Sequence, residues 1–141
     1  MADGIKVEIV SPERLVLSEV AKSVTVPGSE GYFTAMADHA PYMTPLKPGF
    51  ITVTNADGHG HIYFVRGGFA DVSPEGLTIL AEEASPYADF DHDELAAEIR
   101  TAQEELEKAA TPEDKSYAQD VVSALLNLAN EASQINGAHV H

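Results

Sequence analysis

The residues best suited to acid–base chemistry are Asp38 and His39, which are adjacent in the sequence. A histidine beside a carboxylate can serve as a general base, so a small hydrolase is one hypothesis. The chain has no cysteine, no serine stands in a nucleophile-elbow motif, and the nearby hydroxyls of Thr34, Tyr42 and Thr44 form no catalytic pattern. We therefore expect His39 to be a loop histidine that hydrogen-bonds local backbone and shapes a contact surface.

Two other patterns could bind ligands. His59 and His61 are two residues apart, so their imidazoles share one face of an extended strand. A metal site needs three or four ligands and no others are evident, so we expect a solvated hairpin flank and no metal. Gly67–Gly68 lacks the third glycine of a dinucleotide fingerprint, and no Walker sequence occurs. A glycine pair inside a strand more often marks a bulge or a close backbone approach, so no cofactor is expected.

Composition excludes several classes of function. The 141 residues carry 23 acidic and eight basic side chains, a formal charge of −15. A nucleic-acid-binding protein needs clustered Lys and Arg, and an anionic lipid surface would repel this chain. No run approaches the ~18 apolar residues that span a bilayer, and the N-terminus is not typical of a secretory signal. We expect a soluble, intracellular protein whose only link to a membrane runs through another protein.

The sequence that must position these residues changes its pattern near Pro86, from strands and turns to helices. Residues 1–86 hold seven of the eight prolines and alternate short apolar strands with turns, which predicts an antiparallel sandwich or barrel. The segment Val26–Gly49, with three glycines and four prolines, must turn repeatedly and present a shaped surface. The expected strands are Lys6–Val10, Leu15–Leu17, Val24–Val26, Phe50–Thr54, His61–Arg66, Phe69–Val72 and Leu77–Leu80.

Residues 87–141 change to a helical period and predict an antiparallel two-helix hairpin with a short tail. Asp91 or Asp89 can cap the first helix, Thr111 can cap the second, and Gly137 is placed to end it. Alanines make the seam weak, so the hairpin should rest on the sandwich or on a partner. The larger side chains expected to pack in the seam are Leu95, Ile99, Leu106, Tyr117, Val121, Leu125 and Leu128.

Four blocks of the sequence carry a family resemblance. They read VPGSEG from Val26, DHAPYMTPLKPG from Asp38, GGFADV from Gly67 and LTILAEEA from Leu77. In this order and spacing they resemble the epsilon subunit of F-type ATP synthases, whose mitochondrial counterpart is called delta, and the match runs through almost the whole chain. The resemblance implies a non-catalytic subunit with a flattened N-terminal β-sandwich (1–86) and a C-terminal helical hairpin (87–141).

The resemblance also implies partners and a place. Such a subunit belongs to the central stalk, or rotor, of a proton-translocating synthase at the cytoplasmic face of the bacterial inner membrane. The sandwich is expected to bind the gamma subunit through an apolar face, which the sequence does not identify, and to face the polar loops of the c-ring. The beta subunit is a further candidate partner. The loops expected to face the c-ring contain Ser29, Glu30, Gly31, Tyr32, His39, Ala40 and Pro41.

The family's ATP-binding motif is absent as written. Some epsilon subunits use a hydrophobic residue and an Asp shortly before an Arg-Ala pair on the first C-terminal helix. Arg100 is the candidate here, but Ala96 and Ala97 replace the first pair and Thr101 replaces the alanine. We predict no nucleotide site. A nucleotide-sensing regulatory module acting through the hairpin remains the alternative function.

Inhibition through an extended C-terminal arm is the family's other known role. That arm reaches an acidic segment of the beta subunit, which calls for basic residues on the second helix. Residues 86–141 instead carry three basic and twelve acidic side chains, a net of −9. Like charges repel, so we predict weak or no inhibition and a hairpin that stays folded against the sandwich.

Overall fold

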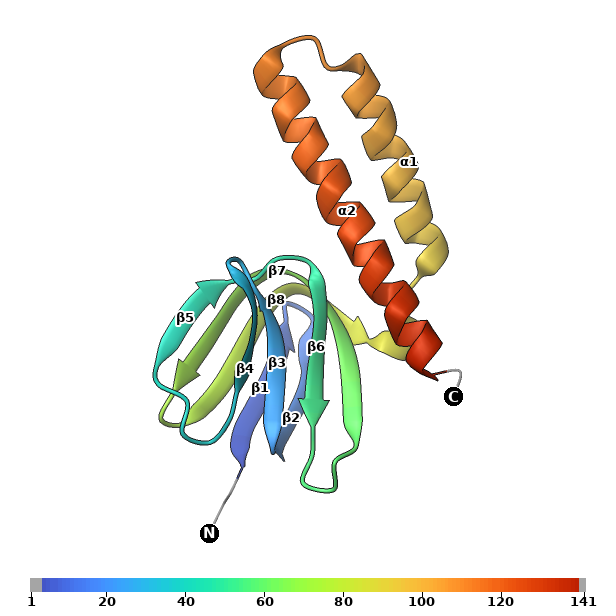
Figure 1. Cartoon of the computed structure of the whole chain (residues 1–141). Helices are drawn as coiled ribbons and strands as arrows, with labels where there is room; N and C mark the ends of the chain where they lie inside the picture. Colours follow the sequence, from blue (N-terminus) through green and yellow to red (C-terminus); the bar gives the residue numbers. More distant parts are fainter. Residues whose placement is uncertain (1–3, 140–141) are drawn as a thin grey trace. The chain divides into compact units, whose positions relative to one another are not determined.

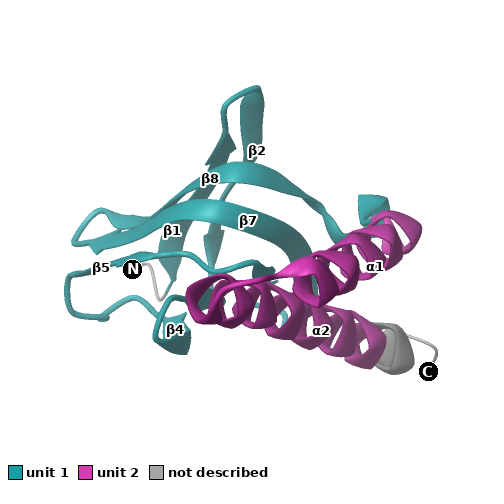
Figure 2. Ribbon diagram, turned by 90° about the horizontal axis from the view of Figure 1, so that it is seen from above, with its two compact units in different colours: residues 1–90 teal, residues 91–141 magenta. Residues whose placement is uncertain are grey.

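The computed structural model describes the backbone of residues 4–139 and the side chains of residues 4–135. The chain forms two compact units, Met1–Phe90 and Asp91–His141 (Figure 2). Within residues 4–139, the first unit contains eight strands and one short 3-10 helix, and the second contains two helices (Figure 1). In chain order they are β1 (Ile5–Ser11), β2 (Arg14–Ala21), β3 (Ser23–Gly28), β4 (Gly31–Ala35), β5 (Tyr42–Pro45), β6 (Gly49–Thr54), β7 (Gly60–Ser73), β8 (Gly76–Pro86), η1 (Tyr87–Asp89), α1 (His92–Lys108) and α2 (Pro112–His139).

The strands form one sheet that folds into two layers. Their order is β2-β1-β8-β7-β6-β3-β4, with β5 paired to β7. The long strand β7 belongs to both layers: residues 60–65 pair with β6, and residues 69–72 pair with β5. We call the layer of β5, β1, β2 and the adjoining parts of β7 and β8 the first layer, and the layer of β6, β3 and β4 the second layer. The sandwich predicted from the sequence is confirmed.

Alternation along the strands builds the core between the layers. Ile5, Val7 and Ile9 of β1 are buried, while the residues between them are more exposed. The same period of two places Val24 and Val26 of β3 inside. Burying these β-branched side chains contributes roughly 1.5–3 kcal/mol each. Other members of the core are Ala21, Ala35, Leu46, Ile51, Val53, Val65, Ala70, Val72, Leu77, Ile79, Ala81 and Ala84.

Strand β7 is continuous where the sequence suggested two strands. Its pairing with β8 keeps one register from Tyr63–Pro86 to Ser73–Gly76, so Gly67 and Gly68 form no bulge. Both have positive φ, 71° and 103°. A β-carbon at Gly68 would overlap the carbonyl oxygen of Leu80. The glycine pair is therefore the close backbone approach, placed where β7 changes its partner from β6 to β5.

One pairing departs from an antiparallel sheet. Strands β1 and β8 run parallel, with Val7 opposite Leu77 and Val10 opposite Leu80. A parallel pair requires a long connection between its strands, and here six other strands supply it. Local patterns do not predict such a pairing, because the two strands are distant in the sequence.

An aromatic cluster ends the first unit. Phe50 and Phe64 are cross-strand neighbours on the outer face of the second layer, with ring centroids 5.7 Å apart. Phe90 lies 5.3 Å from Phe50 and 4.9 Å from Phe64, and Tyr87 lies 5.6 Å from Phe50. The unit boundary therefore falls after Phe90, a few residues later than the division at residue 86 expected from composition.

The two helices of the second unit begin at capping residues that the sequence predicted. The Asp91 carboxylate accepts a hydrogen bond from the Glu94 amide at 2.9 Å, so Asp91 and not Asp89 is the cap of α1. The Thr111 hydroxyl accepts from the Asp114 amide at 3.1 Å and caps α2. Gly137 does not end α2, which continues to His139. Among the described residues, neither helix is long and apolar enough to cross a bilayer.

Burial along the hairpin follows most of the predicted seam. Leu95 and Leu128 are buried, and the other expected residues, Ile99, Leu106, Val121 and Leu125, are half-buried. The prediction is wrong for Tyr117, which is 74% exposed. The end of α1 near it offers Ala109, Ala110 and Lys108, and these small or charged side chains cannot cover a phenol ring.

Candidate functional site

The two loops singled out in the sequence lie together in the first unit. The turn at Ser29–Glu30 joins β3 to β4, and the second loop leads from β4 into β5. The Ser29 amide donates to the Pro45 carbonyl at 2.9 Å, and its hydroxyl lies 3.3 Å from that of Thr44. These bonds fasten the β3–β4 turn to β5. A shallow pocket of about 310 Å³ separates the loops and is lined by Glu30, Gly31, Tyr32, Phe33, His39 and Tyr42.

We call the β3–β4 turn and the loop from β4 into β5, residues 29–32 and 36–41, the loop cluster. Three aromatic rings pack together in and beside it. The centroid of Phe33 lies 5.2 Å from that of Tyr42, in an edge-to-face arrangement, and 5.9 Å from that of His39. Such aromatic pairs add roughly 0.5–1.5 kcal/mol each beyond the area they bury. The β4 strand thus holds the second loop through Phe33. Neither Phe33 nor Tyr42 was predicted for this site; the signal that could have found them is their aromatic character on either side of the loop that contains His39.

His39 is held by backbone. Its Nδ1 lies 2.7 Å from the Ala40 carbonyl oxygen, and its amide donates to the Met36 carbonyl at 3.0 Å. A carbonyl oxygen can only accept, so Nδ1 is the donor in this hydrogen bond. Because Nδ1 donates to Ala40, the Asp38 carboxylate does not orient the ring as a catalytic pair requires. The predicted role, a loop histidine bonded to local backbone, matches this geometry.

Tyr32 connects β4 to β6 at the edge of the loop cluster. Its hydroxyl accepts a hydrogen bond from the Phe50 amide at 3.2 Å. A β-carbon at Gly49 would lie 2.6 Å from the same hydroxyl, so glycine leaves room for it. The ammonium of Lys47 lies 5.5 Å from the ring centroid, within cation–π range. Tyr32 is 41% exposed.

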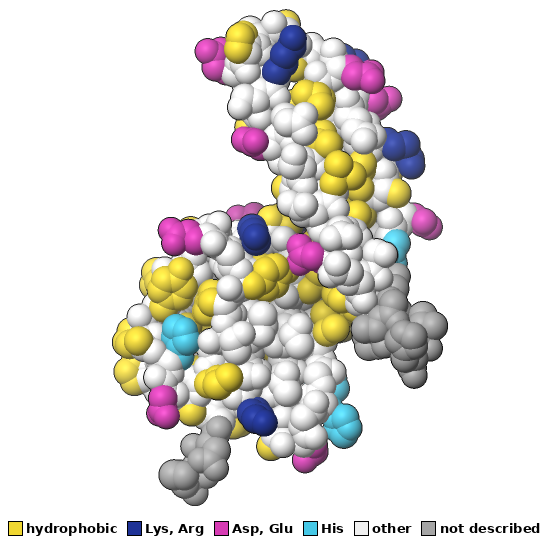
Figure 3. Space-filling model, in the orientation of Figure 1, with side chains coloured by type: hydrophobic (Ala, Val, Ile, Leu, Met, Phe, Trp, Pro, Cys, Tyr) yellow, Lys and Arg dark blue, Asp and Glu magenta, His cyan; other side chains and the backbone are white. Residues whose placement is uncertain are grey.

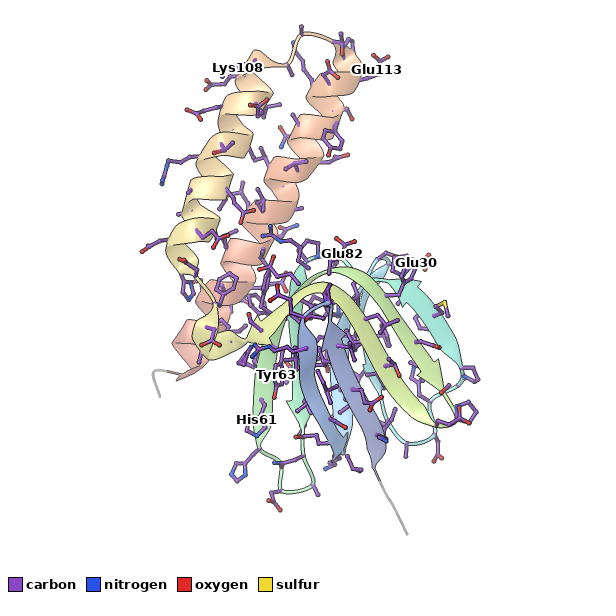
Figure 4. The ribbon with its side chains drawn as sticks, turned by 180° about the vertical axis from the view of Figure 1, so that it is seen from behind. Glu30, His61, Tyr63, Glu82, Lys108 and Glu113 are labelled. Carbon is purple, nitrogen blue, oxygen red and sulfur yellow. The ribbon has the colours of Figure 1, made fainter. Side chains whose placement is uncertain are left out.

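The remaining expected residues are surface positions. Ala40 and Pro41 are exposed, and Glu30 is exposed at the tip of its turn. His59 and His61 are also exposed, and in Figure 4 His61 lies at the far end of the sandwich from Glu30. Within residues 4–135, no group of three His, Cys, Asp or Glu side chains could hold a metal ion.

A second surface feature crosses the outer face of the first layer. The strand registers place Leu15 opposite Val10, Val10 opposite Leu80, Leu80 opposite Phe69, and Phe69 opposite Pro45. We call these five residues the apolar row. Leu15, Leu80 and Phe69 are 56%, 53% and 51% exposed, whereas the flanking Ile79 and Ala70 are fully buried. The row therefore points outward, away from the core.

The row is bounded by polar residues. The next cross-strand line on the same face runs from Ser18 through Glu8 and Thr78 to Asp71. Met43 stands opposite Asp71 and is exposed beside the row. Scattered exposed apolar residues are ordinary, but a continuous line rimmed by polar side chains is typical of an interface.

The hairpin carries an open groove between its helices. It measures about 800 Å³, and its floor includes Ala97, Ala102, Ala118, Val121 and Leu125. Figure 3 shows hydrophobic side chains gathered along the hairpin and charged side chains toward its edges. The charged residues that line the groove are Glu94, Glu98, Glu105, Lys108 and Asp114.

Arg100 does not line this groove; it is exposed on α1. A nucleotide placed in the groove would bring its phosphates against four carboxylates and one ammonium. The negative charges of the phosphates and carboxylates repel each other, which opposes binding. The sequence motif is missing and Arg100 lies outside the groove, and the nucleotide-sensing alternative stays a prediction.

The chain is similar in sequence to one family of known proteins. Residues 4–87 match the family described as ATP synthase, Delta/Epsilon chain, beta-sandwich domain. The chain is 45% identical over 134 residues to the ATP synthase epsilon chain of Rhizobium johnstonii, covering 95% of this chain and 99% of the relative. It is 48% identical over 128 residues to that of Rhizobium etli, covering 91% and 95%.

Solved structures agree on the fold. A chain of the Euglena gracilis mitochondrial ATP synthase, in its OSCP/F1/c-ring structure, superposes with a TM-score of 0.71 at 24% identity, covering all of this chain and 83% of that one. A chain of the Tetrahymena thermophila mitochondrial ATP synthase, in its central stalk/c-ring structure, gives a TM-score of 0.61 at 17% identity, covering 90% and 94%.

Proposed function

The chain belongs to the epsilon-chain family of ATP synthases, a non-catalytic subunit, and from that membership we propose that it is a rotor subunit of the central stalk. In this role it couples rotation of a proton-driven c-ring to the catalytic head. Its place is the cytoplasmic face of the bacterial inner membrane, reached through other subunits. The work is mechanical, so rigidity and complementary surfaces carry it.

The apolar row is the observation that carries the proposal. It supports the outer face of the first layer as the proposed surface for the gamma subunit. Five neighbouring strands contribute one side chain each, and the sheet beneath them holds those side chains in fixed relative positions. A partner that covered the row would remove Leu15, Phe69 and Leu80 from water. The row would then form an apolar centre with a polar rim, as stable interfaces do.

The loop cluster is the proposed surface for the polar loops of the c-ring. Its exposed members are Glu30, Tyr32 and Ala40–Pro41, and His39 sits between them. The backbone bonds of Ser29 and His39 and the ring packing of Phe33 make the loops stiff before a partner arrives. A preformed loop loses less entropy on binding, so it can transmit force without first rearranging.

Binding to gamma tests the proposal. We expect Leu80→Glu to weaken association of the purified chain with a gamma-containing subcomplex by about tenfold or more, because it buries a charge in the centre of the row. The matched control is Leu126→Glu on α2, a leucine of similar exposure (45%), which should bind normally. Equal affinities for the wild type and Leu80→Glu would refute this face, and failure of the wild type to bind any stalk component would refute the function.

We propose that inhibition by the C-terminal arm is weak or absent. The charge of residues 86–141 supports this, at three basic against twelve acidic side chains. Removing residues 91–141 should leave ATP hydrolysis by the assembled enzyme nearly unchanged. A strong rise in hydrolysis after that truncation would contradict it.

A further inference from the structure

The groove between α1 and α2 has a floor and a rim of different chemistry. Its floor consists of small and aliphatic side chains, Ala97 and Ala102 from α1 and Ala118, Val121 and Leu125 from α2. Its rim carries Glu94, Glu105 and Asp114. We propose that this groove binds a basic amphipathic helix of a partner protein, with the partner's apolar face on the alanines and its Lys or Arg side chains over the acidic rim. The proposal does not depend on the assigned rotor function.

The dimensions suit a helix. The groove residues of α1 run from Glu94 to Lys108 at steps of three and one, so they occupy one face of the helix. At 1.5 Å per residue this wall is roughly 21 Å long, about four turns of a docked helix. Alanines let a helix backbone approach closely, because close contact between helices is limited by the side chains at the contact.

Tyr117 supplies an anchor at the end of the groove. It is the most exposed large hydrophobic side chain in the second unit, and it lines the groove beside Ala118 and Val121. In Figure 4 Lys108 and Glu113 mark this end of the hairpin, where α1 ends and α2 begins. Exposed tyrosines beside an apolar groove are frequent binding hot spots, since they bury large area and lose little entropy.

Charge selects among the occupants. Four carboxylates and one ammonium line the groove, in a segment of net charge −9. A nucleotide and an anionic lipid surface are both repelled, and a second copy of the hairpin carries the same negative charge. A helix flanked by Lys or Arg is attracted, and it also provides the apolar face that the floor requires.

Two labelled peptides test the proposal with the full-length chain. One is a 16-residue amphipathic helix with Leu and Ala on one face and Lys on the other, and its counterpart has Glu in place of every Lys. Fluorescence anisotropy should show saturable micromolar binding of the Lys peptide, weakening as salt is raised. Absence of binding at 100 µM peptide, or equal binding of the Glu peptide, would overturn the proposal.

Matched variants locate the binding. Ala97 lines the groove, whereas its neighbour Ala96 is exposed but does not line it. Ala97→Trp should fill the groove and weaken binding of the Lys peptide about tenfold, whereas Ala96→Trp should leave its affinity unchanged. The double variant Glu94→Gln with Glu105→Gln should weaken binding of the Lys peptide about fivefold. The control pair Glu104→Gln with Glu107→Gln removes the same charge outside the groove and should change the affinity less than twofold.

Other outcomes would assign the groove differently. Equal losses in the two tryptophan variants, or in the two glutamine pairs, would mean that the peptide binds elsewhere. Saturable binding of ATP with Mg²⁺, or of anionic vesicles, that Ala97→Trp abolishes would assign the groove to that ligand. Circular dichroism of each variant should match the wild type, and Ala96→Trp provides the control for folding.

Discussion

The backbone of Gly68 lies so close to the carbonyl oxygen of Leu80 that no β-carbon fits between them. The contact occurs beside the apolar row, since Phe69 follows Gly68 and pairs directly with Leu80. Strand β7 passes from one layer to the other at this point, with Gly67 and Gly68 at positive φ. The same glycine thus shapes the core and sets the outward surface proposed to meet the gamma subunit.

Gly68→Ala should be one of the most damaging single-methyl additions in the sandwich. It combines a steric overlap with an unfavourable φ of 103°, so we expect a loss of about 2 kcal/mol or more in the free energy of unfolding. Gly58→Ala is the control, because Gly58 also has positive φ, 86°, but nothing lies within 4 Å of its added methyl. It should cost about 1 kcal/mol. Urea denaturation of both variants, followed by near-ultraviolet circular dichroism, measures the difference, and equal costs would rule out the overlap.

Phe90→Ala should loosen the end of the first unit. The ring contacts Phe50 and Phe64, with centroids 5.3 and 4.9 Å away, and its loss should cost about 2–3 kcal/mol. Hydrogen exchange of the backbone amides of residues 87–90 should become faster, because η1 would lose its anchor. Phe90→Tyr keeps the ring and should exchange like the wild type. Unchanged exchange in Phe90→Ala would show that the cluster does not hold η1.

Thr111→Ala should weaken the start of α2. The mutation removes the 3.1 Å hydrogen bond that the Thr111 hydroxyl accepts from the Asp114 amide, a cap worth about 1 kcal/mol. Hydrogen exchange at Asp114 should rise while exchange near Leu128 stays constant. Thr111→Ser retains the acceptor and should restore protection. A similar loss in both variants would mean that the methyl group, and not the cap, stabilises this end.

Alkaline pH should destabilise the sandwich partly through Tyr63. Burial, and secondarily the charge of Glu19, raises the pKa of Tyr63 above its ordinary value of 10.0. Its contribution to stability is therefore fully present below pH 10 and is lost as the pH rises through the higher pKa of the folded state. Tyr63→Phe cannot ionise, so its urea midpoint should fall less between pH 9 and pH 11.5 than that of the wild type. Parallel pH profiles of the two proteins would exclude this role.

Local patterns predicted most of the elements. Alternation along Lys6–Val10 identified β1, the run Phe50–Thr54 before a turn identified β6, and the capping pattern at Thr111 identified the start of α2. Composition also predicted that nucleic acid is not a ligand, because the net charge does not depend on the fold, and this stays a prediction. These features are local, or simple sums over residues, so the sequence alone determines them.

The errors in prediction also have a physical cause. Gly137 was expected to end α2, but a glycine only permits a helix to stop and does not force it. Tyr117 was placed in the seam by its period, yet the alanines at the end of α1 leave it exposed. Periodicity identifies the face of a helix, whereas the partner's side chains decide how much of that face is covered.

Only the tertiary structure decided the two surfaces. The apolar row exists because five strands take one particular register, including the parallel pair of β1 and β8, and no local pattern specifies partners so far apart in the chain. The loop cluster likewise required Phe33 to contact His39 and Tyr42 across a turn of the chain. Sequence determines which residues point the same way along one strand. Which strands lie side by side, and which outward residues therefore form one surface, depends on long-range packing of the whole core.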